Sequence, residues 1–271
     1  MIFAPAGVVR RKLRQLLKAA LGSAPRKQVL LDLYAGCGRV GASWQTLSGR
    51  GRVSLDVQAD ADLDLRNPVV VNFLRGWIAA RVVRAVFMGP PCTTWSRASG
   101  GYYRSACHIY GQPSLSGRAL AKATDGNLHV RSCALLVQAC LDHGVPIGLE
   151  NPRWSMMWDE PVLSHLLQHP RCRNACTYFC QHGARWKKPT RVAMWNSRPP
   201  VSQLTRTCAA RGNCCSRTHL PHIQLKGSGP GGKAWTSIAE PYPPSFARLI
   251  ANWLHASANA TEHAHACKLL F

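Results

Sequence analysis

The sequence predicts an α/β fold built on a parallel, doubly wound sheet, and three observations support this prediction. Apolar strand signals alternate with helical periodicity through the first half of the chain. One of these strands runs directly into a glycine-rich turn that opens a helix. The 271 residues, 46% of them hydrophobic, are enough for one large domain or for one domain with a small appendage.

The alternating elements follow one another in a regular order. Residues 1–27 contain "VVRRKLRQLLKAAL", whose apolar spacing fits an amphipathic first helix, with a basic transit peptide as the alternative. Apolar runs then predict buried strands, and 3.6-residue spacing predicts the helices between them. The predicted strands are 28–36, 51–58, 84–92 and 146–154, and the predicted helices are 39–47, 67–82 and 130–144.

The texture of the sequence changes after about residue 195. Residues 196–235 are rich in Pro, Gly, Cys, His and basic side chains and have little periodicity, which predicts a small irregular insertion. Periodicity returns in 243–257, a helix with proline near its start, and residues 258–271 are expected to be a frayed tail.

The charge of the chain is strongly one-sided. It carries 34 Lys and Arg against 12 Asp and Glu, a net charge of +22. Such a domain is expected to bind a polyanion, nucleic acid first of all, although a basic solvated surface without a specific partner would have the same composition. No apolar run is long enough to span a membrane, and no secretory signal is visible, so we expect an intracellular protein without a membrane partner. The twelve cysteines are then expected as thiols, catalytic groups or metal ligands.

The glycine turn after the first strand matches a known cofactor pattern. Gly36, Gly38 and Gly41 satisfy G-x-G-x-x-G, and Asp56 follows about twenty residues later at the end of the next strand. This arrangement lets an adenosyl cofactor approach the backbone while the acid accepts hydrogen bonds from its ribose.

The acids around the turn indicate which adenosyl cofactor is favoured. Asp32, two residues before Tyr34, places a carboxylate near the loop, where it would repel a pyrophosphate but not a cation. Asp64 lies at the expected end of a further short strand, where it can accept a hydrogen bond from an adenine amino group. The pocket therefore favours cationic S-adenosylmethionine over a nicotinamide dinucleotide.

A candidate nucleophile follows the strand at 84–92. Pro90 and Pro91 fix a rigid turn and present Cys92 at the carboxyl end of the strand, where open α/β sheets bind ligands. A buried structural cysteine is the alternative interpretation of this position.

Four stretches together resemble the cytosine-5 DNA methyltransferase family. They are "LLDLYAGCGRVGASW", "VFMGPPCTTWS", "GLENPRW" and "EPYPPSFARLI", in the order in which the family has them. The resemblance implies a Rossmann-like S-adenosylmethionine-dependent methyltransferase fold with a small irregular insertion. It implies a catalytic domain at 28–195 that is completed by 236–257, with 196–235 as a reduced target-recognition region.

The resemblance also assigns catalytic roles. It implies that Cys92 adds to C6 of cytosine and that Glu150 contacts N3 and the exocyclic amine, with Asn151 bracing the site. A helix N-terminus after the proline turn and basic neighbours are expected to lower the pKa of the Cys92 thiol. The family's third catalytic stretch matches only partly, and Arg185 is preferred there over Lys187 or Arg191.

The remaining implications concern ligands and partners. The resemblance implies S-adenosylmethionine as cofactor and DNA as substrate, with RNA as the near variant and a non-catalytic nucleic-acid-binding module as the alternative. We expect a monomer, nuclear if the source is eukaryotic. The implied cofactor-binding residues are Asp32, Tyr34, Ala35, Gly36, Cys37, Gly38, Asp56, Asp64 and Pro90.

Cysteine and histidine residues crowd into and just before the insertion. Cys208, Cys214, Cys215, His219 and His222 lie in it, with Cys172, Cys176 and Cys180 upstream. Zinc would organise a segment with so little apolar content, but the spacings do not give two C-x₂-C pairs. No metal ligand is assigned from the sequence, and reduced thiols with loop histidines remain the alternative to zinc.

Overall fold

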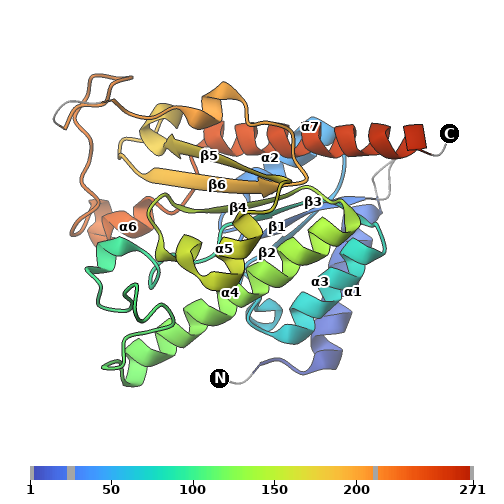
Figure 1. Ribbon diagram of the computed structural model, residues 1–271, viewed down its shortest axis with the longest axis horizontal. Helices are drawn as coiled ribbons and strands as arrows, with labels where there is room; N and C mark the ends of the chain where they lie inside the picture. Colours follow the sequence, from blue (N-terminus) through green and yellow to red (C-terminus); the bar gives the residue numbers. More distant parts are fainter. Residues whose placement is uncertain (1–2, 23–27, 210–212, 269–271) are drawn as a thin grey trace.

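A six-stranded sheet forms the centre of the computed structural model. The structure describes residues 3–22, 28–209 and 213–268, and for residues 261–268 it describes the backbone alone. The strand order is β2-β1-β3-β4-β6-β5. Figure 1 shows the sheet between two layers of helices. The predicted α/β fold is therefore confirmed, and its topology is that of a Rossmann-like doubly wound domain.

The first four strands are parallel. They are β1 (Val29–Leu33), β2 (Arg52–Leu55), β3 (Val83–Met88) and β4 (Ile147–Pro152). In the sheet, β2 lies on one side of β1 and β3 lies on the other. The direction in which successive strands are added therefore reverses at β1. Open α/β sheets bind their ligands at the carboxyl ends of the strands beside such a reversal.

The other two strands correct the expectation of a wholly parallel sheet. β5 (Cys172–Tyr178) and β6 (Pro189–Trp195) form an antiparallel hairpin, and β6 is also antiparallel to β4. The sequence analysis did not predict these strands. β5 interrupts its apolar residues with Arg173 and Asn174, both exposed, and lacks the continuous hydrophobic run that marks the parallel strands.

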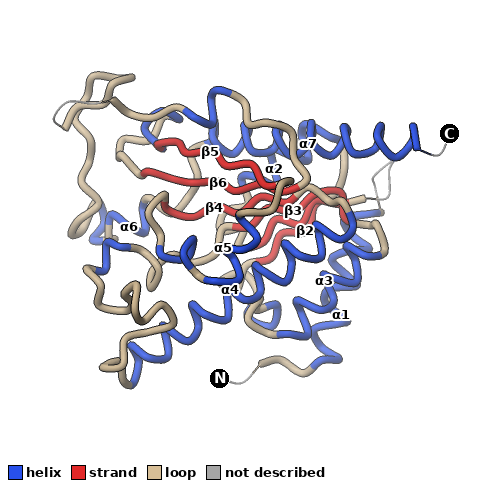
Figure 2. The backbone as a smooth tube through the Cα atoms, in the orientation of Figure 1, coloured by secondary structure: helices blue, strands red, loops and turns tan. Residues whose placement is uncertain are grey.

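Helices cover both faces of the sheet. Helices α1, α3 and α4 lie on one face, while α2 and α7 pack together on the other (Figures 1 and 2). The short α5 packs against α4, and α6 precedes the final helix. Their bounds are α1 (Ala6–Leu21), α2 (Arg39–Ser48), α3 (Pro68–Ala79), α4 (Gly117–His143), α5 (Pro161–Leu167), α6 (Trp235–Ile238) and α7 (Pro244–Lys268).

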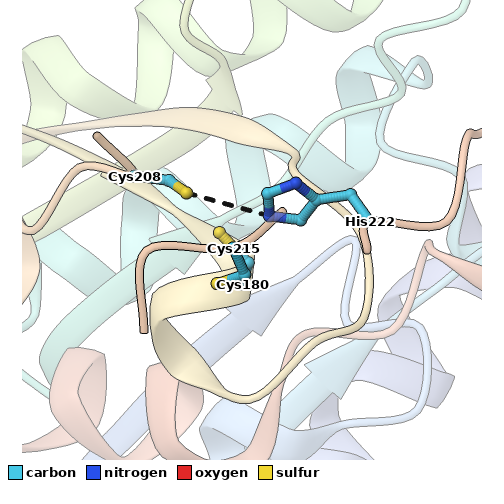
Figure 3. Close-up of side chains that lie close together, drawn as sticks. All are labelled: Cys180, Cys208, Cys215 and His222. Carbon is cyan, nitrogen blue, oxygen red and sulfur yellow. Dashed lines mark hydrogen bonds between the residues drawn. The ribbon is translucent and has the colours of Figure 1, made fainter. Parts of the chain in front are cut away.

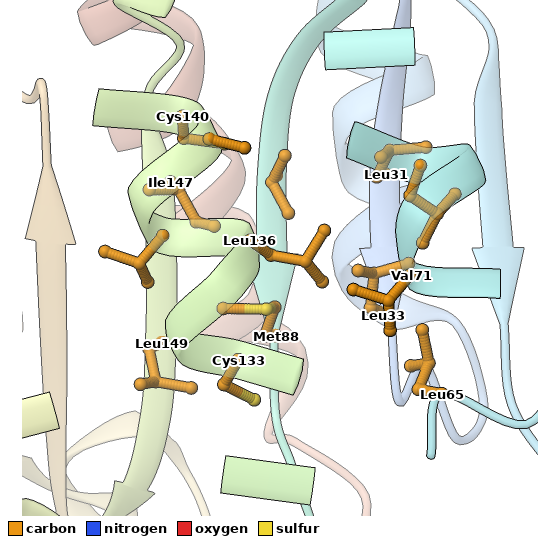
Figure 4. Packing of buried hydrophobic residues seen from close by; sticks show 14 of the residues in the cluster. Leu31, Leu33, Leu65, Val71, Met88, Cys133, Leu136, Cys140, Ile147 and Leu149 are labelled. Atoms are coloured by element: carbon orange, nitrogen blue, oxygen red, sulfur yellow. The ribbon is translucent and has the colours of Figure 1, made fainter. Parts of the chain in front are cut away.

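The alternation of side chains along the strands divides the core into two halves. On β1, Leu31 and Leu33 face the α3–α4 layer, whereas Leu30 faces the α2–α7 layer. Figure 4 shows Leu136 and Cys133 of α4 close to Met88 of β3 in the first of these halves. Both faces of the central strands are thus buried, which explains their nearly continuous apolar sequence.

The two ends of the chain differ in how well the sequence predicted them. Helix α1 buries Val9 and Leu13 in the core, as an ordinary amphipathic helix does. Helix α7 continues to Lys268, past the expected end at 257, because its alanine-rich continuation contains neither Gly nor Pro. In the described part of the chain, no helix has both the length and the apolar character that crossing a membrane requires.

Residues 196–235 have little regular structure where they are described. They contain two 3₁₀ turns (Ser202–Thr205 and Pro230–Gly232), two isolated β-bridges and the first residue of α6. Irregular structure was predicted for this stretch from its composition.

Candidate active site

A cavity of about 460 Å³ opens at the carboxyl edge of the parallel strands. The segments that follow β1, β2 and β3 line it, together with the last residues of β4 and with residues from α4, the β5–β6 hairpin and the stretch before α7. It brings together most of the predicted site residues: Tyr34, Ala35, Gly36, Cys37, Asp56, Asp64, Pro90, Cys92 and Glu150. Gly38, Asp32 and Arg185 are not among the lining residues.

The glycine turn has the backbone conformation that its sequence requires. Gly36 and Gly38 have φ angles of 52° and 68°, and Gly38 is the N-cap residue of α2. Tyr34 also has a positive φ, 57°, although it is not a glycine. Asp56 Oδ2 accepts a hydrogen bond of 2.8 Å from the Gly36 N–H, so the end of β2 fixes the turn after β1. Gly38 thus shapes the turn without lining the cavity.

Asp32 of β1 accepts a hydrogen bond from the first turn of helix α2. Its Oδ2 accepts a 2.9 Å hydrogen bond from the Gly41 N–H, and a Cβ at Gly41 would lie 2.8 Å from that oxygen. The third glycine of the motif therefore permits close packing of helix on strand. Burial raises the pKa of Asp32 to about 7, because the hydrogen bond from Gly41 and the charge of Arg52 only partly offset it. The structure gives Asp32 this supporting position rather than a place on the cavity wall.

Asp64 lines the cavity but already has a charged partner. Arg66 donates to both of its carboxylate oxygens, at 2.8 and 3.0 Å from Nε, and also pairs with Asp125 of α4 at 2.6 Å. Burial acts to raise the pKa of Asp64, but the hydrogen bonds from Arg66 outweigh it and lower that pKa. An adenine amino group would have to share this carboxylate with Arg66.

His129 on α4 is a lining residue that the sequence analysis did not identify. Its Nδ1 lies 3.2 Å from the Tyr34 hydroxyl, and the two rings meet edge to face at 5.3 Å. Burial, assisted by the charge of Arg66, lowers the pKa of His129 to about 4. The imidazole is therefore neutral near pH 7 and adds an uncharged aromatic wall beside the glycine turn.

Cys92 follows the Gly89-Pro90-Pro91 turn, as expected, and its side chain is half-buried. The N–H groups of Trp95 and Ser96 donate to its carbonyl oxygen. The expected lowering of the Cys92 pKa is wrong: burial raises this pKa, and the charge of Lys188 opposes the rise without reversing it, while Glu150 adds to it. A tight turn leads instead to the 3₁₀ segment Arg97–Ser99, so no helix N-terminus follows the thiol directly.

A buried arginine supports the loop that carries Cys92. Arg104 is 1% exposed, and its guanidinium lies 3.6 Å from the centre of the Trp95 ring. It donates to the carbonyl and the hydroxyl of Thr94, both at 3.1 Å, and to the Ala123 carbonyl at 2.7 Å. Trp95 in turn donates to the Gly126 carbonyl at 3.1 Å. The loop after the thiol is thereby fastened to α4.

Glu150 is buried at the end of β4. Its Oε2 accepts a hydrogen bond of 2.8 Å from Tyr242, whereas its Oε1 has no hydrogen-bond partner. Burial raises the pKa of Glu150, and Lys188, Tyr242 and Thr190 only partly oppose this rise. The neighbouring Asn151 donates to the Pro90 carbonyl at 3.0 Å and so braces the turn before Cys92, as the resemblance implied.

Lys188 is the charged residue that the sequence analysis missed. It lines the cavity, and its charge lowers the pKa of both Cys92 and Glu150. It precedes β6, and the β4–β6 pairing brings the start of that strand to the end of β4. The signal in the sequence was the run "WKKP", but choosing between its lysines requires the strand pairing.

The arginines considered in the same stretch lie elsewhere. Arg185 is exposed, and its carbonyl oxygen accepts a hydrogen bond from the Ile223 N–H of the insertion. Arg191 donates to Asn174 on β5 and lies 4.8 Å from the Trp158 ring. A catalytic role for Arg185 stays a prediction.

The segment before α7 closes the cavity from the C-terminal side. Ser237, Glu240, Pro241 and Tyr242 line it. Arg39 of α2 donates to the Tyr242 carbonyl oxygen, so this segment is attached to the helix that follows the glycine turn. The "EPYPP" stretch thus reaches the same site as the three N-terminal motifs.

Comparison with known proteins gives only distant similarity. No family model matches the chain, and no curated protein matches it. The structure of the Entamoeba histolytica methyltransferase EhMeth aligns over 88% of this chain and 97% of its own, with a TM-score of 0.36 and 10% identity. The S. pombe Dnmt2 methyltransferase aligns over 62% of this chain and 49% of its own, with a TM-score of 0.35 and 14% identity. The fold assignment rests on the strand order and register given above.

Proposed function

We propose that the protein is an S-adenosylmethionine-dependent methyltransferase that modifies C5 of cytosine in DNA, with Cys92 as its nucleophile. One observation carries this proposal: Cys92, Glu150 and Lys188 line the same cavity as the glycine turn and Asp56. In this proposal, residues 28–195 and 236–257 form the catalytic domain, and residues 196–235 contact the target.

The residues around the glycine turn fit the proposed cofactor. A Cβ built on Gly36 would have no atom within 4 Å, so the backbone is open to a ligand at this point. Asp56 stands beside it with lone pairs left for ribose hydroxyls, in addition to those engaged by the Gly36 and Gln58 N–H groups. When bound, S-adenosylmethionine supplies an electrophilic methyl group.

The cysteine and the glutamate can divide the chemistry between them. The Cys92 thiolate adds to C6 of cytosine, and the electron pair released from the C5–C6 double bond is delocalised to N3. Glu150 holds a proton for N3, and its raised pKa favours the protonated form that this role needs. C5 would then take the methyl group as its bond to the sulfonium sulfur breaks, with S-adenosylhomocysteine as the leaving group. Transfer of the C5 proton to a water molecule, return of the N3 proton to Glu150 and cleavage of the C6–sulfur bond then restore the aromatic ring and free Cys92.

The charge of Lys188 partly offsets the effect of burial on the pKa of Cys92. Burial raises the Cys92 pKa, which disfavours the thiolate in the cavity. The positive charge of the Lys188 ammonium group lowers the pKa of Cys92 and so stabilises that thiolate. We assign Lys188 the role of activating the nucleophile.

The net charge of +22 supports a nucleic acid as the substrate. Lys and Arg contacts to phosphates make such binding weaken steeply as salt is added. A cytosine in a duplex cannot enter the cavity while stacked, so the enzyme must turn the base out of the helix.

The test is direct analysis of the methylated product. The full chain is incubated with methyl-labelled S-adenosylmethionine and with DNA or RNA of varied sequence, and the digested nucleosides are identified by mass spectrometry. We expect label in 5-methyldeoxycytidine, none with Cys92→Ala, and normal incorporation with Cys107→Ala, whose thiol is exposed and outside the cavity. Label in RNA alone would overturn the assignment to DNA. Absence of label in every substrate would favour a non-catalytic nucleic-acid-binding module.

A further inference from the structure

We propose that Cys180, Cys208, Cys215 and His222 bind a zinc ion that fastens the irregular insertion to the β5–β6 hairpin. These residues offer three sulfur atoms and one imidazole nitrogen, all within 4.8 Å of one another, and all four residues are buried. Figure 3 shows their side chains converging from separate segments of the chain. The sequence analysis left zinc open and assigned no ligand.

One separation among the four ligand atoms has the length expected around a tetrahedral ion, and the others are all below 4.8 Å. With zinc–sulfur bonds of about 2.3 Å, tetrahedral geometry places the ligand atoms about 3.5 to 3.8 Å apart. Cys208 Sγ and His222 Nε2 are 3.8 Å apart. Three cysteines and one histidine complete the coordination of Zn²⁺ and leave no open position, which is the pattern of structural rather than catalytic zinc sites.

Donors surround the sulfur atoms as they do in thiolate–metal sites. The Ser216 N–H points to Cys208 Sγ at 3.4 Å, and the Arg217 N–H points to Cys215 Sγ at 3.5 Å. The amide of Gln181 lies 3.6 Å from the sulfur of Cys180. Such outer contacts stabilise negative sulfur and orient it toward a metal.

A zinc ion would stabilise the fold of the insertion, which buries few apolar side chains. Among its described residues, Leu204 packs into the α2–α7 half of the core, and the other buried apolar side chains, Cys208 and Cys215, lie in a small cluster with Tyr178 and Cys180 of the hairpin. A segment with so little apolar burial gains its folding free energy from another source, and a bound zinc ion can supply it. Ligands on both partners would also explain why the insertion returns to the hairpin, where the Ile223 N–H donates to the Arg185 carbonyl.

The other cysteines and histidines nearby do not join the cluster. Cys214 and His219 are exposed, and the His182 ring is engaged with the Thr177 hydroxyl at 2.7 Å. The grouping was not visible from spacing because six residues separate Cys208 from Cys215, and another six separate Cys215 from His222. The fourth ligand comes from the hairpin.

The proposal is tested by the metal content of the purified full chain. The protein is produced in zinc-supplemented medium, kept reduced and dialysed, and its zinc is measured by inductively coupled plasma mass spectrometry. We expect about one zinc ion per chain, falling at least about tenfold in Cys208→Ser and Cys215→Ser. Cys214→Ser and His219→Ala are the matched controls and should keep the ion. Wild type without zinc, or equal loss in Cys214→Ser, would overturn the proposal.

A second measurement separates ligand loss from misfolding. Co²⁺ in the wild-type site should give the absorption bands of a tetrahedral site with three thiolates, and His222→Cys should retain the metal while shifting these bands toward those of a four-thiolate site. A chelator should lower the melting temperature of wild type but not that of Cys208→Ser. An unchanged cobalt spectrum in His222→Cys would remove His222 from the site. These readouts do not depend on methyl transfer, so they can fail or succeed independently of the proposed function.

Discussion

The hydroxyl of Tyr242 donates a hydrogen bond of 2.8 Å to Glu150 Oε2, and so joins the segment before α7 to the carboxyl end of β4. The same hydroxyl lies against Gly89, so closely that a Cβ at this position would overlap it. The Tyr242 ring meets Phe87 and Phe179 edge to face. Residues distant in sequence therefore fix one buried carboxyl group.

Replacing Gly89 by alanine should disturb this arrangement. In Gly89→Ala the added methyl group displaces the Tyr242 hydroxyl, and Glu150 loses a hydrogen bond that lowers its pKa. We expect methyl transfer to fall at least about tenfold and the pKa of Glu150 to rise further, both measured from the pH profile of the single-turnover rate.

Two variants control this prediction. Gly76→Ala in α3 has open space around its Cβ and should leave the rate unchanged. If overlap is the cause, adding Tyr242→Phe to Gly89→Ala should cost less than the sum of the two single effects. A wild-type rate in Gly89→Ala would contradict the proposed role of the Tyr242–Glu150 contact.

Lys188→Gln should make the Cys92 thiol less reactive. Without the ammonium charge the pKa of Cys92 rises further, so less thiolate is present at a given pH. We expect the alkylation of Cys92 by iodoacetamide near pH 8 to slow by about three- to tenfold. Mass spectrometry of the peptide that contains Cys92 measures the rate. Lys187→Gln, at the exposed neighbouring position, is the control. Equal slowing in both variants would argue against a specific action of Lys188.

Asp32 should make stability depend on pH. Its folded-state pKa, about 7, lies above the ordinary aspartate value of 3.8, so the folded protein binds more protons than the unfolded chain between these values. The free energy of unfolding should therefore fall as pH rises from about 4 to 7, by up to about 4 kcal/mol, and this loss should be absent below the unfolded pKa. Urea unfolding of Asp32→Asn should show a flatter pH profile. A profile as steep as that of wild type would exclude Asp32 as its source.

Asp56→Ala should weaken the binding of S-adenosylmethionine. The carboxylate fixes the Gly36 N–H and is placed to accept from the ribose, so its loss should cost about 1.5–3 kcal/mol in calorimetry. Asp62→Ala removes an acid outside the cavity that pairs with Lys12, and should leave affinity unchanged. Unchanged affinity in Asp56→Ala would remove Asp56 from the cofactor site.

The parts of the site that the sequence predicted are local in the chain. The glycine turn, Cys92 and Glu150 each end a continuous apolar run, and Asp56 follows the short strand Arg52–Leu55; parallel strands place such ends on one edge of the sheet. Their convergence therefore follows from recognising the strands alone.

The parts that it missed depend on pairing between distant segments. Lys188 reaches the cavity through the reversed strand β6, and the four proposed zinc ligands meet because the insertion folds back on the hairpin. The pKa of Cys92 was misjudged because burial, which the local sequence does not reveal, outweighs its basic neighbour.

Covalent trapping at Cys92 tests the central claim most directly. DNA containing 5-fluorocytosine should trap the nucleophile after methyl transfer, because fluorine at C5 cannot leave as a proton does and the sulfur–C6 bond then persists. With S-adenosylmethionine, wild type and Cys107→Ser should give a protein–DNA species that survives boiling in detergent, and Cys92→Ser should give none. An adduct that persists in Cys92→Ser, or no adduct with wild type on varied DNA, would contradict the assignment of Cys92 as the nucleophile.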